Sequence, residues 1–419
     1  MKKISTILVV LMIAAMLLSA CAQATPAPTA APVEPTAAPV EPTAAPVEPT
    51  AVPPTEVPPT EVPPTEVPPT EAAPAEAFKV GFVTDTGGIS DGSFNETQWN
   101  GVVAGCKEYG CEPKYIVSNE AADYEPNLTE FAGQGYQLVQ AAGFFLGGAV
   151  AKVAVQYPDV KFTIFDYSYP NSFDVPEGQI GNKECIPNVE GQIFKTDQAS
   201  FLAGYLAAGM TKTGKIGTFG GAKIPTVTIF AVGFQKGMEL YNQVHGTDVK
   251  LVGWDSATGE GIFTGDFQDQ VKGKEATQSL FDEGADIFMP VGGQIGIPGF
   301  EVARERGGYG IWVDTDGYVT LPGVQDVILT SVMKVMDVAA TSVIKDVKEG
   351  NFKGCSNYVG DMPNAGVGLA PYHDVASKVP ADLQAEIEGL KAKIISGEIT
   401  DTGCLSAPDW CPSGLYTTP

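Results

Sequence analysis

The feature that most constrains this chain is an alternation, from Phe78 onward, of short apolar runs with segments of helix length. Strands are expected at 78–85, 112–118, 137–145, 161–167, 179–187, 215–220, 249–254, 286–291, 310–314 and 327–331. Helices are expected at 94–109, 124–135, 147–157, 199–210, 227–242, 267–284, 296–307 and 335–349. Alternation of this kind predicts the α/β class, with parallel strands covered by helices on both faces of the sheet.

Two successive sets of these elements indicate two doubly wound lobes rather than one core. The chain after residue 77 holds roughly 340 residues, more than a single core usually supports. We expect an N-terminal lobe of 78–189, completed by about 325–355. The C-terminal lobe is then 190–324, with the segment from about 356 to the tail at 419. Two lobes joined by hinge crossovers can close over a small ligand.

Residues 1–21 are typical of an export signal, because Lys2 and Lys3 precede an apolar run that ends in the sequence LSAC at Cys21. This ending resembles a bacterial lipobox, which implies cleavage before Cys21 and lipidation of that residue. An ordinary signal peptide with an incidental cysteine is the alternative. The lipobox predicts a protein held by a lipid anchor at the extracytoplasmic face of the cell membrane.

Residues 22–77 form a low-complexity linker in which APVEPTA and VPPTE repeat. The linker has too few large apolar side chains to bury a core, so we expect it to be disordered with a bias toward polyproline II. At ~3.1 Å per residue, a fully extended linker reaches on the order of 150 Å. It could hold the lobes away from a membrane, and a glycosylated stalk through cell-wall material fits the same composition.

The charge balance argues against nucleic acid as a partner. The chain carries 25 Lys and Arg against 50 Asp and Glu, a formal net charge of -25, without a basic stripe. Nucleic-acid binding needs clustered positive charge. No apolar run after the export signal is long enough to span a bilayer.

Six cysteines remain besides Cys21, and an even number in an oxidising compartment suggests disulfides. The suggested pairs are Cys106–Cys111, Cys404–Cys411 and, as the remainder, Cys185–Cys355. A metal site is the weaker interpretation, because the chain has no CxxC and its two histidines, His245 and His373, lie far apart in sequence. We therefore expect no bound metal.

The segment 78–101 combines a strand, a glycine pair and a helix start. Open α/β sheets bind ligands at such turns, beyond the carboxyl ends of their strands. Here Asp85 and Asn95 can hold polar edges, and the ring of Phe94 can stack on a flat ligand. A plain strand-to-helix turn with Phe94 in the core is the alternative. The candidate capping residues for the helix are Ser90, Asp91 and Ser93.

Polar groups also follow other expected strands. They are Asp166, Asp255, Gly292 with Gly293, Asp314 with Asp316, and Lys334. Because the carboxyl ends of parallel strands face the crevice, a set of this size suggests one ligand site shared by both lobes. For any single Asp, capping of the following helix explains the position equally well.

Seven stretches occur in order along the chain. They are TDTGGISDGSFNETQWNG from Thr84, FGGAKIPTVTIFAVGFQKG from Phe219, DFQDQVKGKEAT from Asp266, VGGQIGIPGFEVARERG from Val291, WVDTDG from Trp312, LTSVMK from Leu329, and the tail with NAGVGLAPYH and KIISGEI. Together they resemble the basic membrane protein lipoproteins, the purine-nucleoside-binding substrate proteins of ABC transporters. The resemblance runs through nearly all of 78–399.

The resemblance implies a type I periplasmic-binding-protein fold that clamps a nucleoside between its lobes. The residues it implies for the base are Asp85, Asp166, Phe94 of the SFN motif, and Phe267, with the two rings on opposite faces of the base. The residues it implies for the ribose are Gly293, Asp314 and Lys334.

Two positions depart from the family pattern. Gly317 in VDTDG stands where glutamine is usual, and DGSFN lacks a lysine that often follows its aspartate. The sequence leaves open whether Asp314 or Asp316 reaches the sugar, and whether Phe263 or Phe267 supplies the second ring. The alternative roles are core packing for the two phenylalanines and a solvated helix start for Lys334.

These observations favour a membrane-tethered solute receptor that delivers a purine nucleoside to an ABC permease, as a monomer without a cofactor. A binding protein for a sugar or another small ligand that acts as a sensor would close in the same way. A nucleoside-processing enzyme is the least favoured hypothesis. The two histidines are widely separated in sequence and do not suggest a catalytic set of nucleophile, histidine and acid. Stacking rings and a tether favour holding a ligand over cleaving it.

Overall fold

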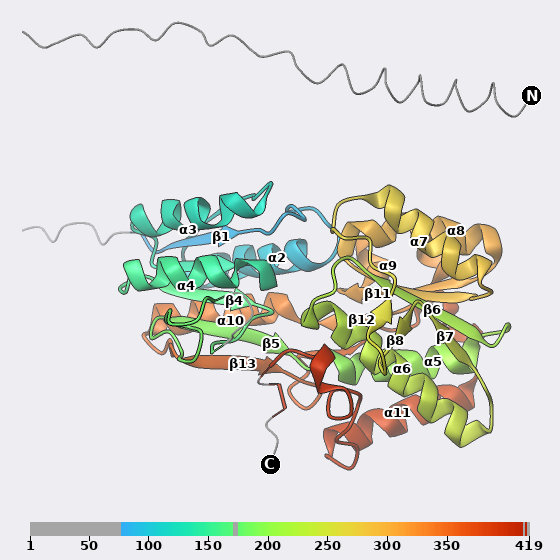
Figure 1. The fold of residues 1–419 in the computed structure, drawn as a ribbon. Helices are drawn as coiled ribbons and strands as arrows, with labels where there is room; N and C mark the ends of the chain where they lie inside the picture. The colour runs from blue at the N-terminus through green and yellow to red at the C-terminus, as the bar shows by residue number, and fades with distance from the viewer. Residues whose placement is uncertain (1–76, 171–174, 414, 417–419) are drawn as a thin grey trace, which may run out of the picture. The chain divides into compact units, whose positions relative to one another are not determined.

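The computed structural model describes residues 77–170, 175–413, 415 and 416 (Figure 1). The expected export signal at 1–21, with Cys21, and all but the last residue of the linker 22–77 lie outside these residues. Within them, strands and helices alternate along the chain and form two six-stranded sheets. The expected α/β fold with two lobes is confirmed.

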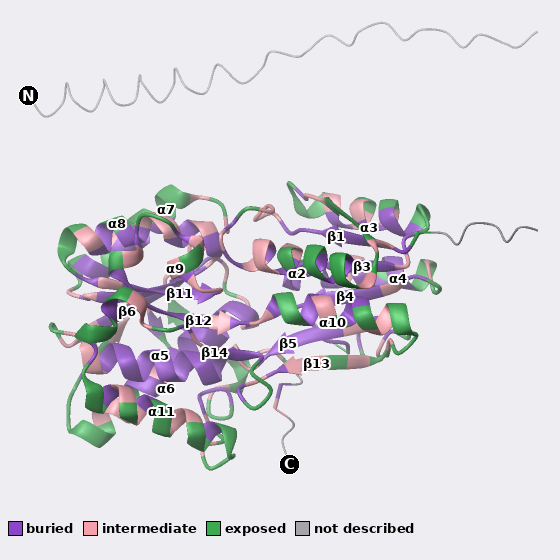
Figure 2. Cartoon of the chain, turned by 180° about the vertical axis from the view of Figure 1, so that it is seen from behind, coloured by how far each residue is buried: buried purple, intermediate pink, exposed green. Residues whose placement is uncertain are grey.

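The first sheet, that of lobe 1, is parallel throughout, in the order β13-β5-β4-β3-β1-β2. Its strands are β1 (Lys79–Val83), β2 (Glu112–Ile116), β3 (Leu138–Ala141), β4 (Lys161–Phe165), β5 (Val189–Phe194) and β13 (Ser356–Gly360). Its helices are α2 (Phe94–Tyr109), α3 (Tyr124–Gly133), α4 (Gly147–Gln156) and α10 (Met336–Glu349). Both faces are covered (Figure 2), since Phe82 packs with α2 and α10 whereas Val83 packs with α3 and α4.

The second sheet, that of lobe 2, has the order β14-β12-β11-β10-β6-β7, and only β14 runs antiparallel to its neighbour. Its strands are β6 (Lys215–Gly220), β7 (Lys250–Val252), β10 (Ile287–Val291), β11 (Tyr309–Asp314), β12 (Ile328–Lys334) and β14 (Val367–Leu369). Its helices are α5 (Thr196–Met210), α6 (Pro225–His245), α7 (Gln270–Asp282), α8 (Ile297–Arg306), α9 (Gly317–Thr320) and α11 (Ala381–Ile395). A hairpin of β8 (Trp254–Asp255) and β9 (Glu260–Gly261) lies beside it.

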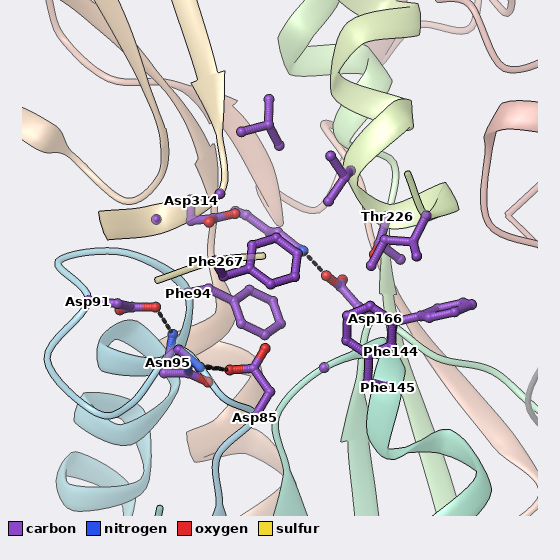
Figure 3. A pocket seen from close by; sticks show the side chains of 18 of the residues that line it. Asp85, Asp91, Phe94, Asn95, Phe144, Phe145, Asp166, Thr226, Phe267 and Asp314 are labelled. Carbon is purple, nitrogen blue, oxygen red and sulfur yellow. Dashed lines mark hydrogen bonds and ion pairs between the residues drawn. The ribbon is translucent and has the colours of Figure 1, made fainter. Parts of the chain in front are cut away.

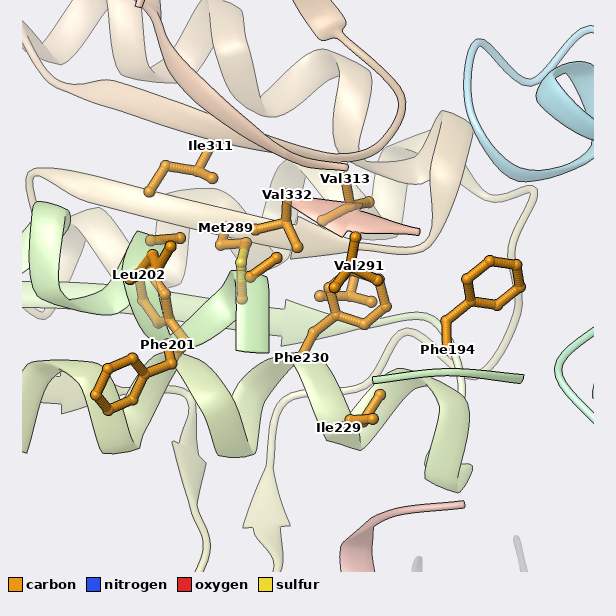
Figure 4. Close-up of a cluster of buried hydrophobic side chains, with 14 of the residues drawn as sticks. Phe194, Phe201, Leu202, Ile229, Phe230, Met289, Val291, Ile311, Val313 and Val332 are labelled. Atoms are coloured by element: carbon orange, nitrogen blue, oxygen red, sulfur yellow. The ribbon is translucent and has the colours of Figure 1, made fainter. Parts of the chain in front are cut away.

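The core of lobe 2 lies between its sheet and the helix pair α5 and α6. Phe201, Leu202 and Phe230 of these helices share one cluster of buried side chains with Met289 and Val291 of β10 (Figure 4). Nearly every residue of α5 is buried, because α6, α11 and the sheet surround it. Among the described residues, the helices are all too short or too polar to cross a membrane.

Within the described residues the chain crosses between the lobes after β5, after β12 and between β13 and β14. The expected lobe boundaries at 189/190, 325 and 355/356 are each wrong by the length of one strand. Strands β5 and β13 pair in the first sheet, and β12 pairs with β11 in the second. The crossing follows each strand rather than preceding it. Helix α10 does pack on α2, where Thr341 Oγ1 donates to the Gly101 carbonyl over 2.9 Å.

Two further strands that the sequence predicts are not found in the structure as expected. Residues 179–187 form turns and bends, and the strand lies at Val189–Phe194 instead. Gly178 and Gly181 have positive φ angles of 87° and 91°, which favours turns there. The expected strand 249–254 is divided into β7 and β8 at Gly253, whose φ is 84°.

The structure contains the three suggested disulfides. Cys106–Cys111 links the end of α2 to the residue before β2, and Cys185–Cys355 links the approaches to the neighbouring strands β5 and β13. Cys404–Cys411 closes a loop in the C-terminal tail. Each bridge restricts the unfolded chain, most strongly where the closed loop is long.

Helices α5 and α6 meet backbone to backbone through glycines. A Cβ on Gly204 would overlap the Phe234 carbonyl, and a Cβ on Gly237 would overlap the Phe201 carbonyl. A backbone carbonyl within a helix cannot rotate away as a flexible side chain can. The close approach of the two helices therefore depends on the absence of side chains at these positions.

Replacing Gly237 by Ala should lower the free energy of unfolding by ~1–3 kcal/mol, because overpacking would force the helices apart. Gly389 of α11 is the matched control, since nothing lies within 4 Å of a Cβ built there. Gly389→Ala should raise stability by ~0.5–1 kcal/mol through helix propensity. Urea unfolding followed by circular dichroism measures both, and effects of the same sign would contradict the close approach.

Candidate functional site

A cavity of about 590 Å³, including the space at its open side, lies between the two lobes (Figure 3). Strand ends of both sheets supply much of its wall, as in the ligand crevices of other open α/β sheets. The described residues that line it are Asp85, Gly87, Asp91, Phe94, Asn95, Gly143, Phe144, Phe145, Asp166, Ile224, Thr226, Val227, Phe230, Phe267, Val291, Gly292, Gly293, Asp314 and Lys334. An apolar wall with a few inward polar groups is typical of small-molecule sites.

The turn between β1 and α2 holds Asp85 and Asn95 together. Asn95 Nδ2 and the Gly87 amide each donate to Asp85 Oδ1 over 2.8 Å. The Asn95 Oδ1 atom is buried and has no hydrogen-bond partner within the described structure. Because an unsatisfied buried acceptor is costly, a donor on a ligand would stabilise this turn.

Ser93 is the N-cap residue of α2, but the side chain of Asp91 is the one that satisfies the amides at the helix start. Its carboxylate accepts hydrogen bonds from the amides of Ser93, Asn95 and Glu96 over 3.0, 2.9 and 3.1 Å. Burial raises the pKa of Asp91 to about 7, although these amides oppose the shift. Ser93 instead donates across the lobes to Asp314 Oδ2 over 2.8 Å.

Asp166 and Lys334 form a buried ion pair between the lobes. Lys334 Nζ lies 2.6 Å from Asp166 Oδ2 and 4.8 Å from the centre of the Phe94 ring. The second distance is that of a cation–π contact. Burial raises the pKa of Asp166 to about 6, an effect that Lys334 opposes.

Asp166 and Asp314 hold equivalent places in the two lobes. Asp166 follows β4 and Asp314 ends β11, with φ angles of 62° and 71°. This left-handed backbone is one that Asp tolerates better than bulky residues do. It turns each carboxylate toward the cavity (Figure 3). Burial also raises the pKa of Asp314 and of Asp85.

Phenyl rings enter the cavity from both lobes. Phe94 begins α2 in lobe 1, and Phe267 precedes α7 in lobe 2 (Figure 3). A Cβ on Gly143 would lie 3.3 Å from Phe94 Cε1, and a Cβ on Gly221 would overlap the Phe267 ring. These glycines therefore leave room for the rings. Phe145 approaches Phe267 across the lobes, with ring centres 6.3 Å apart.

Hydrogen bonds also join the lobes beside the cavity. Gln268 Nε2 donates to the Thr86 carbonyl, and Gln294 Nε2 donates to the Gly87 carbonyl over 3.1 Å. Both glutamines belong to lobe 2, and both carbonyls belong to the β1–α2 turn of lobe 1. The structure therefore has its lobes in a closed arrangement.

The predicted ligand residues that line the cavity are Asp85, Phe94, Asn95, Asp166, Phe267, Gly293, Asp314 and Lys334. Asp316 lies outside the described lining, because it caps α9 and its Oδ2 atom is 2.8 Å from His373 Nε2. Phe263 packs on Trp254 and Gly220 instead. Asp255 is an exposed residue of the β8–β9 hairpin.

Sequence reasoning missed Asp91 as a cavity residue and the walls formed by Phe144 and Phe145 and by the start of α6. The expected strand 137–145 ends at Ala141, and Gly143, with φ 103°, turns the chain so that the two rings face the cavity. That glycine was the available clue. On α6, Thr226 and Phe230 line the cavity because this helix begins at a strand end, where the crevice rule also applies.

The arrangement suits binding rather than covalent chemistry. Residues 88–92 read GISDG, a G-x-S-x-G pattern, but Ser90 is exposed and neither histidine lies in the described lining. A serine–histidine pair is therefore not assembled at the cavity. Among the described residues, no group of three or more His, Cys, Asp or Glu side chains is placed to hold a metal ion.

Comparison with known proteins identifies the family. Residues 78–401 match the family described as "ABC transporter substrate-binding protein PnrA-like". The CD4+ T-cell-stimulating antigen of Listeria monocytogenes is 31% identical over 340 residues, which cover 77% of this chain and 87% of that protein. The ABC transporter nucleoside-binding protein BmpA of Lactococcus lactis is 27% identical, with 77% and 88% covered.

Solved structures share the fold. One is a solute-binding protein of an ABC transporter system from Aeropyrum pernix K1, which superposes with a TM-score of 0.66 at 27% identity. The superposition covers 77% of this chain and 92% of that protein. Another from Conexibacter woesei gives a TM-score of 0.56 at 24% identity, with 77% and 98% covered. These matches confirm the type I periplasmic-binding-protein fold.

The family also settles the general class of activity. Its members are substrate-binding proteins of ABC transporters, so the expectation that this chain is not an enzyme is confirmed. A relative from Borrelia garinii, 30% identical over 329 residues, is named basic membrane protein A1. The chain belongs to the basic membrane protein, or PnrA-like, family of ABC transporter substrate-binding proteins.

Proposed function

We propose that this protein binds a purine nucleoside between its lobes and delivers it to an ABC permease. The observation that carries the proposal is one cavity with phenyl rings from opposite lobes, Phe94 and Phe267, and a rim of inward carboxylates. The Lactococcus lactis relative that is named nucleoside-binding supports the class of ligand.

The base is assigned to the two rings. A flat heterocycle between Phe94 and Phe267 would be buried from water and would gain ~0.5–1.5 kcal/mol per aromatic pair from stacking. Asp85 and Asp166 would accept hydrogen bonds from ring N–H groups or an exocyclic amine. The unpartnered Asn95 Oδ1 atom would accept a further one.

The ribose is assigned to Asp314, Lys334 and Gly293. A carboxylate accepts from a sugar hydroxyl and an ammonium donates to one, and such charge-assisted bonds are strong. Gly293 has a φ of 61°, and a Cβ there would lie 3.5 Å from Asp91 Oδ2. Any larger residue would narrow this part of the cavity.

Charge favours a nucleoside over a nucleotide. The described lining holds four carboxylates, those of Asp85, Asp91, Asp166 and Asp314, and one ammonium, that of Lys334. In a site of low dielectric, a phosphate group would be repelled by these carboxylates. An uncharged ligand rich in hydrogen-bond donors fits better.

The tether is assigned from the sequence. Lipidation of Cys21 and the Pro-rich linker 22–77 would hold the lobes at the outer face of the cell membrane, near a permease. A relative from Pyrococcus abyssi, 28% identical over 289 residues, is named a lipoprotein. We assign the working form as a monomer, because one chain supplies both walls of the cavity.

Isothermal calorimetry with inosine, guanosine, adenosine, uridine, inosine monophosphate and ribose tests the proposal. The purine nucleosides should bind and raise the melting temperature, because a ligand of the folded state alone stabilises it. Ribose and the monophosphate should bind about tenfold more weakly or worse, a difference of ~1.4 kcal/mol. Ribose binding as tight as nucleoside binding would support the sugar receptor and contradict the proposal.

Phe94→Ala should weaken nucleoside binding by ~1–3 kcal/mol, because it removes one stacking face and its buried area. Phe263→Ala is the matched control, since this ring packs on Trp254 outside the cavity. The control should lower thermal stability while leaving affinity near that of the unchanged protein. Equal affinities of the two variants in calorimetry would remove Phe94 from the site.

Asp314→Asn should weaken nucleoside binding about tenfold or more, because hydrogen bonds to a charged group contribute ~1.5–3 kcal/mol. Asp316→Asn changes the same kind of side chain two residues away, where it caps α9 and contacts His373. This control should alter stability but not affinity. The opposite ranking would assign the sugar contact to Asp316.

A further inference from the structure

The C-terminal tail lies beyond the residues that match the family, which end at 401. We define the C-terminal strap as Thr402–Ser413 together with Leu415 and Tyr416. It follows α11 and its loop, and it ends at the junction of the two lobes (Figure 1). The Cys404–Cys411 disulfide closes its middle part.

The first anchor of the strap is Asp197, a fully buried carboxylate in the first turn of α5, directly after the β5–α5 crossover. Thr402 Oγ1 donates to Asp197 Oδ2 over 2.6 Å, and the Tyr416 hydroxyl lies 2.7 and 2.6 Å from the two carboxylate oxygens. The Nζ atom of Lys195, a residue of the crossover itself, lies 5.0 Å from the centre of the Tyr416 ring. The strap is therefore fixed to the hinge through a group that would otherwise be a buried, unpaired charge.

The second anchor is Trp410, which packs on lobe 2. Its Nε1 donates to the Ser256 carbonyl over 2.9 Å, and its own carbonyl accepts from Thr228 Oγ1 over 2.5 Å. The ring lies edge to face with Trp254, at 5.8 Å between centres. Thr228 adjoins Thr226 and Val227, which line the cavity, so Trp410 holds the end of α6 that forms the cavity wall.

The third anchor reaches lobe 1. Ser168 Oγ donates to the Ser413 carbonyl over 3.1 Å. Ser168 follows Asp166 by two residues, and Asp166 lines the cavity. One short segment thus contacts the hinge, the α6 wall in lobe 2 and the Asp166 loop in lobe 1.

We propose that the C-terminal strap is a positioning element of the ligand site, which holds the Asp166 loop and the α6 wall together in the closed arrangement. The inference rests on the proposed function, because it assigns the strap a share of ligand affinity. Contacts that exist only when the lobes are closed raise the closed population and slow ligand release. A strap that merely stabilises lobe 2 would not need the bond from Ser413 to Ser168.

Two full-length variants test the strap, and both keep the cavity lining intact. Ser168→Ala removes the bond to lobe 1, and Tyr416→Phe removes the hydroxyl at Asp197 but keeps the ring. The matched controls are Ser356→Ala, whose hydroxyl donates to the Lys353 carbonyl in lobe 1, and Tyr318→Phe, whose hydroxyl donates to Asp374 in lobe 2. Each control removes the same chemical group away from the strap.

Stopped-flow and calorimetric measurements with inosine give the dissociation rate and the Kd. Ser168→Ala should raise both about 2- to 10-fold, the range expected for one neutral hydrogen bond. Tyr416→Phe should raise both by at least as much, because its hydroxyl bonds a carboxylate. The controls should leave both unchanged. Unchanged values in the strap variants would overturn the positioning role.

Hydrogen exchange in the ligand-free protein separates this inference from the proposed function. The strap variants should speed amide exchange at residues 166–169 and 224–230, whereas the controls should not. If the unchanged protein fails to bind any purine nucleoside, the proposed function is wrong and the exchange result alone decides on the strap. Equal amide exchange rates at these residues in the strap variants, the controls and the unchanged protein would then overturn the positioning role of the strap.

Discussion

Burial of charge between the lobes governs how the site is arranged. Asp85, Asp166, Asp314 and Lys334 are each at most 8% exposed, and charged groups removed from water are costly unless they are paired. Two of the pairings cross the lobes, from Lys334 to Asp166 and from Ser93 to Asp314. When the lobes separate, water can hydrate these groups, and when they close, the opposite lobe has to supply partners. Closure of the lobes and pairing of these charged groups are therefore coupled.

The protein's own donors do not fully offset the burial of the polar groups in the cavity. Burial raises the pKa of Asp85, Asp91, Asp166 and Asp314, which means that the surrounding donors do not fully compensate for lost hydration of the ionised form. The Asn95 Oδ1 atom likewise has no partner within the described structure. On the proposed function, a neutral ligand with several N–H and O–H groups would supply further donors to these acceptors. The same polar groups would then stabilise the closed arrangement around the ligand.

The strand ends could be predicted from the sequence because apolar runs have readable limits and the crevice rule is general. That reasoning found Asp85, Asp166 and Asp314. It could not distinguish Asp314 from Asp316, because the choice depends on a left-handed turn at Asp314 that an Asp-rich loop does not reveal. It also placed the residues of β12 and β13 in the wrong lobes. A buried strand such as β12 has the same pattern in either sheet, and no strand was expected at β13. Tertiary pairing, rather than local sequence, decides such cases.

In the described part of the chain, the hinge consists of the crossovers that join the lobes after β5, after β12 and between β13 and β14. Its backbone bonds, from the Lys195 amide to the Gly360 carbonyl over 2.8 Å and from the Val335 amide to the Gly366 carbonyl over 2.9 Å, join one crossover to another. None of the four residues in these two bonds lines the cavity. A ligand shifts the balance only through interactions that differ between the two states. On our proposals, those interactions lie in the cavity and in the strap, so affinity would depend on residues outside the hinge as well as on the rings proposed to hold the base.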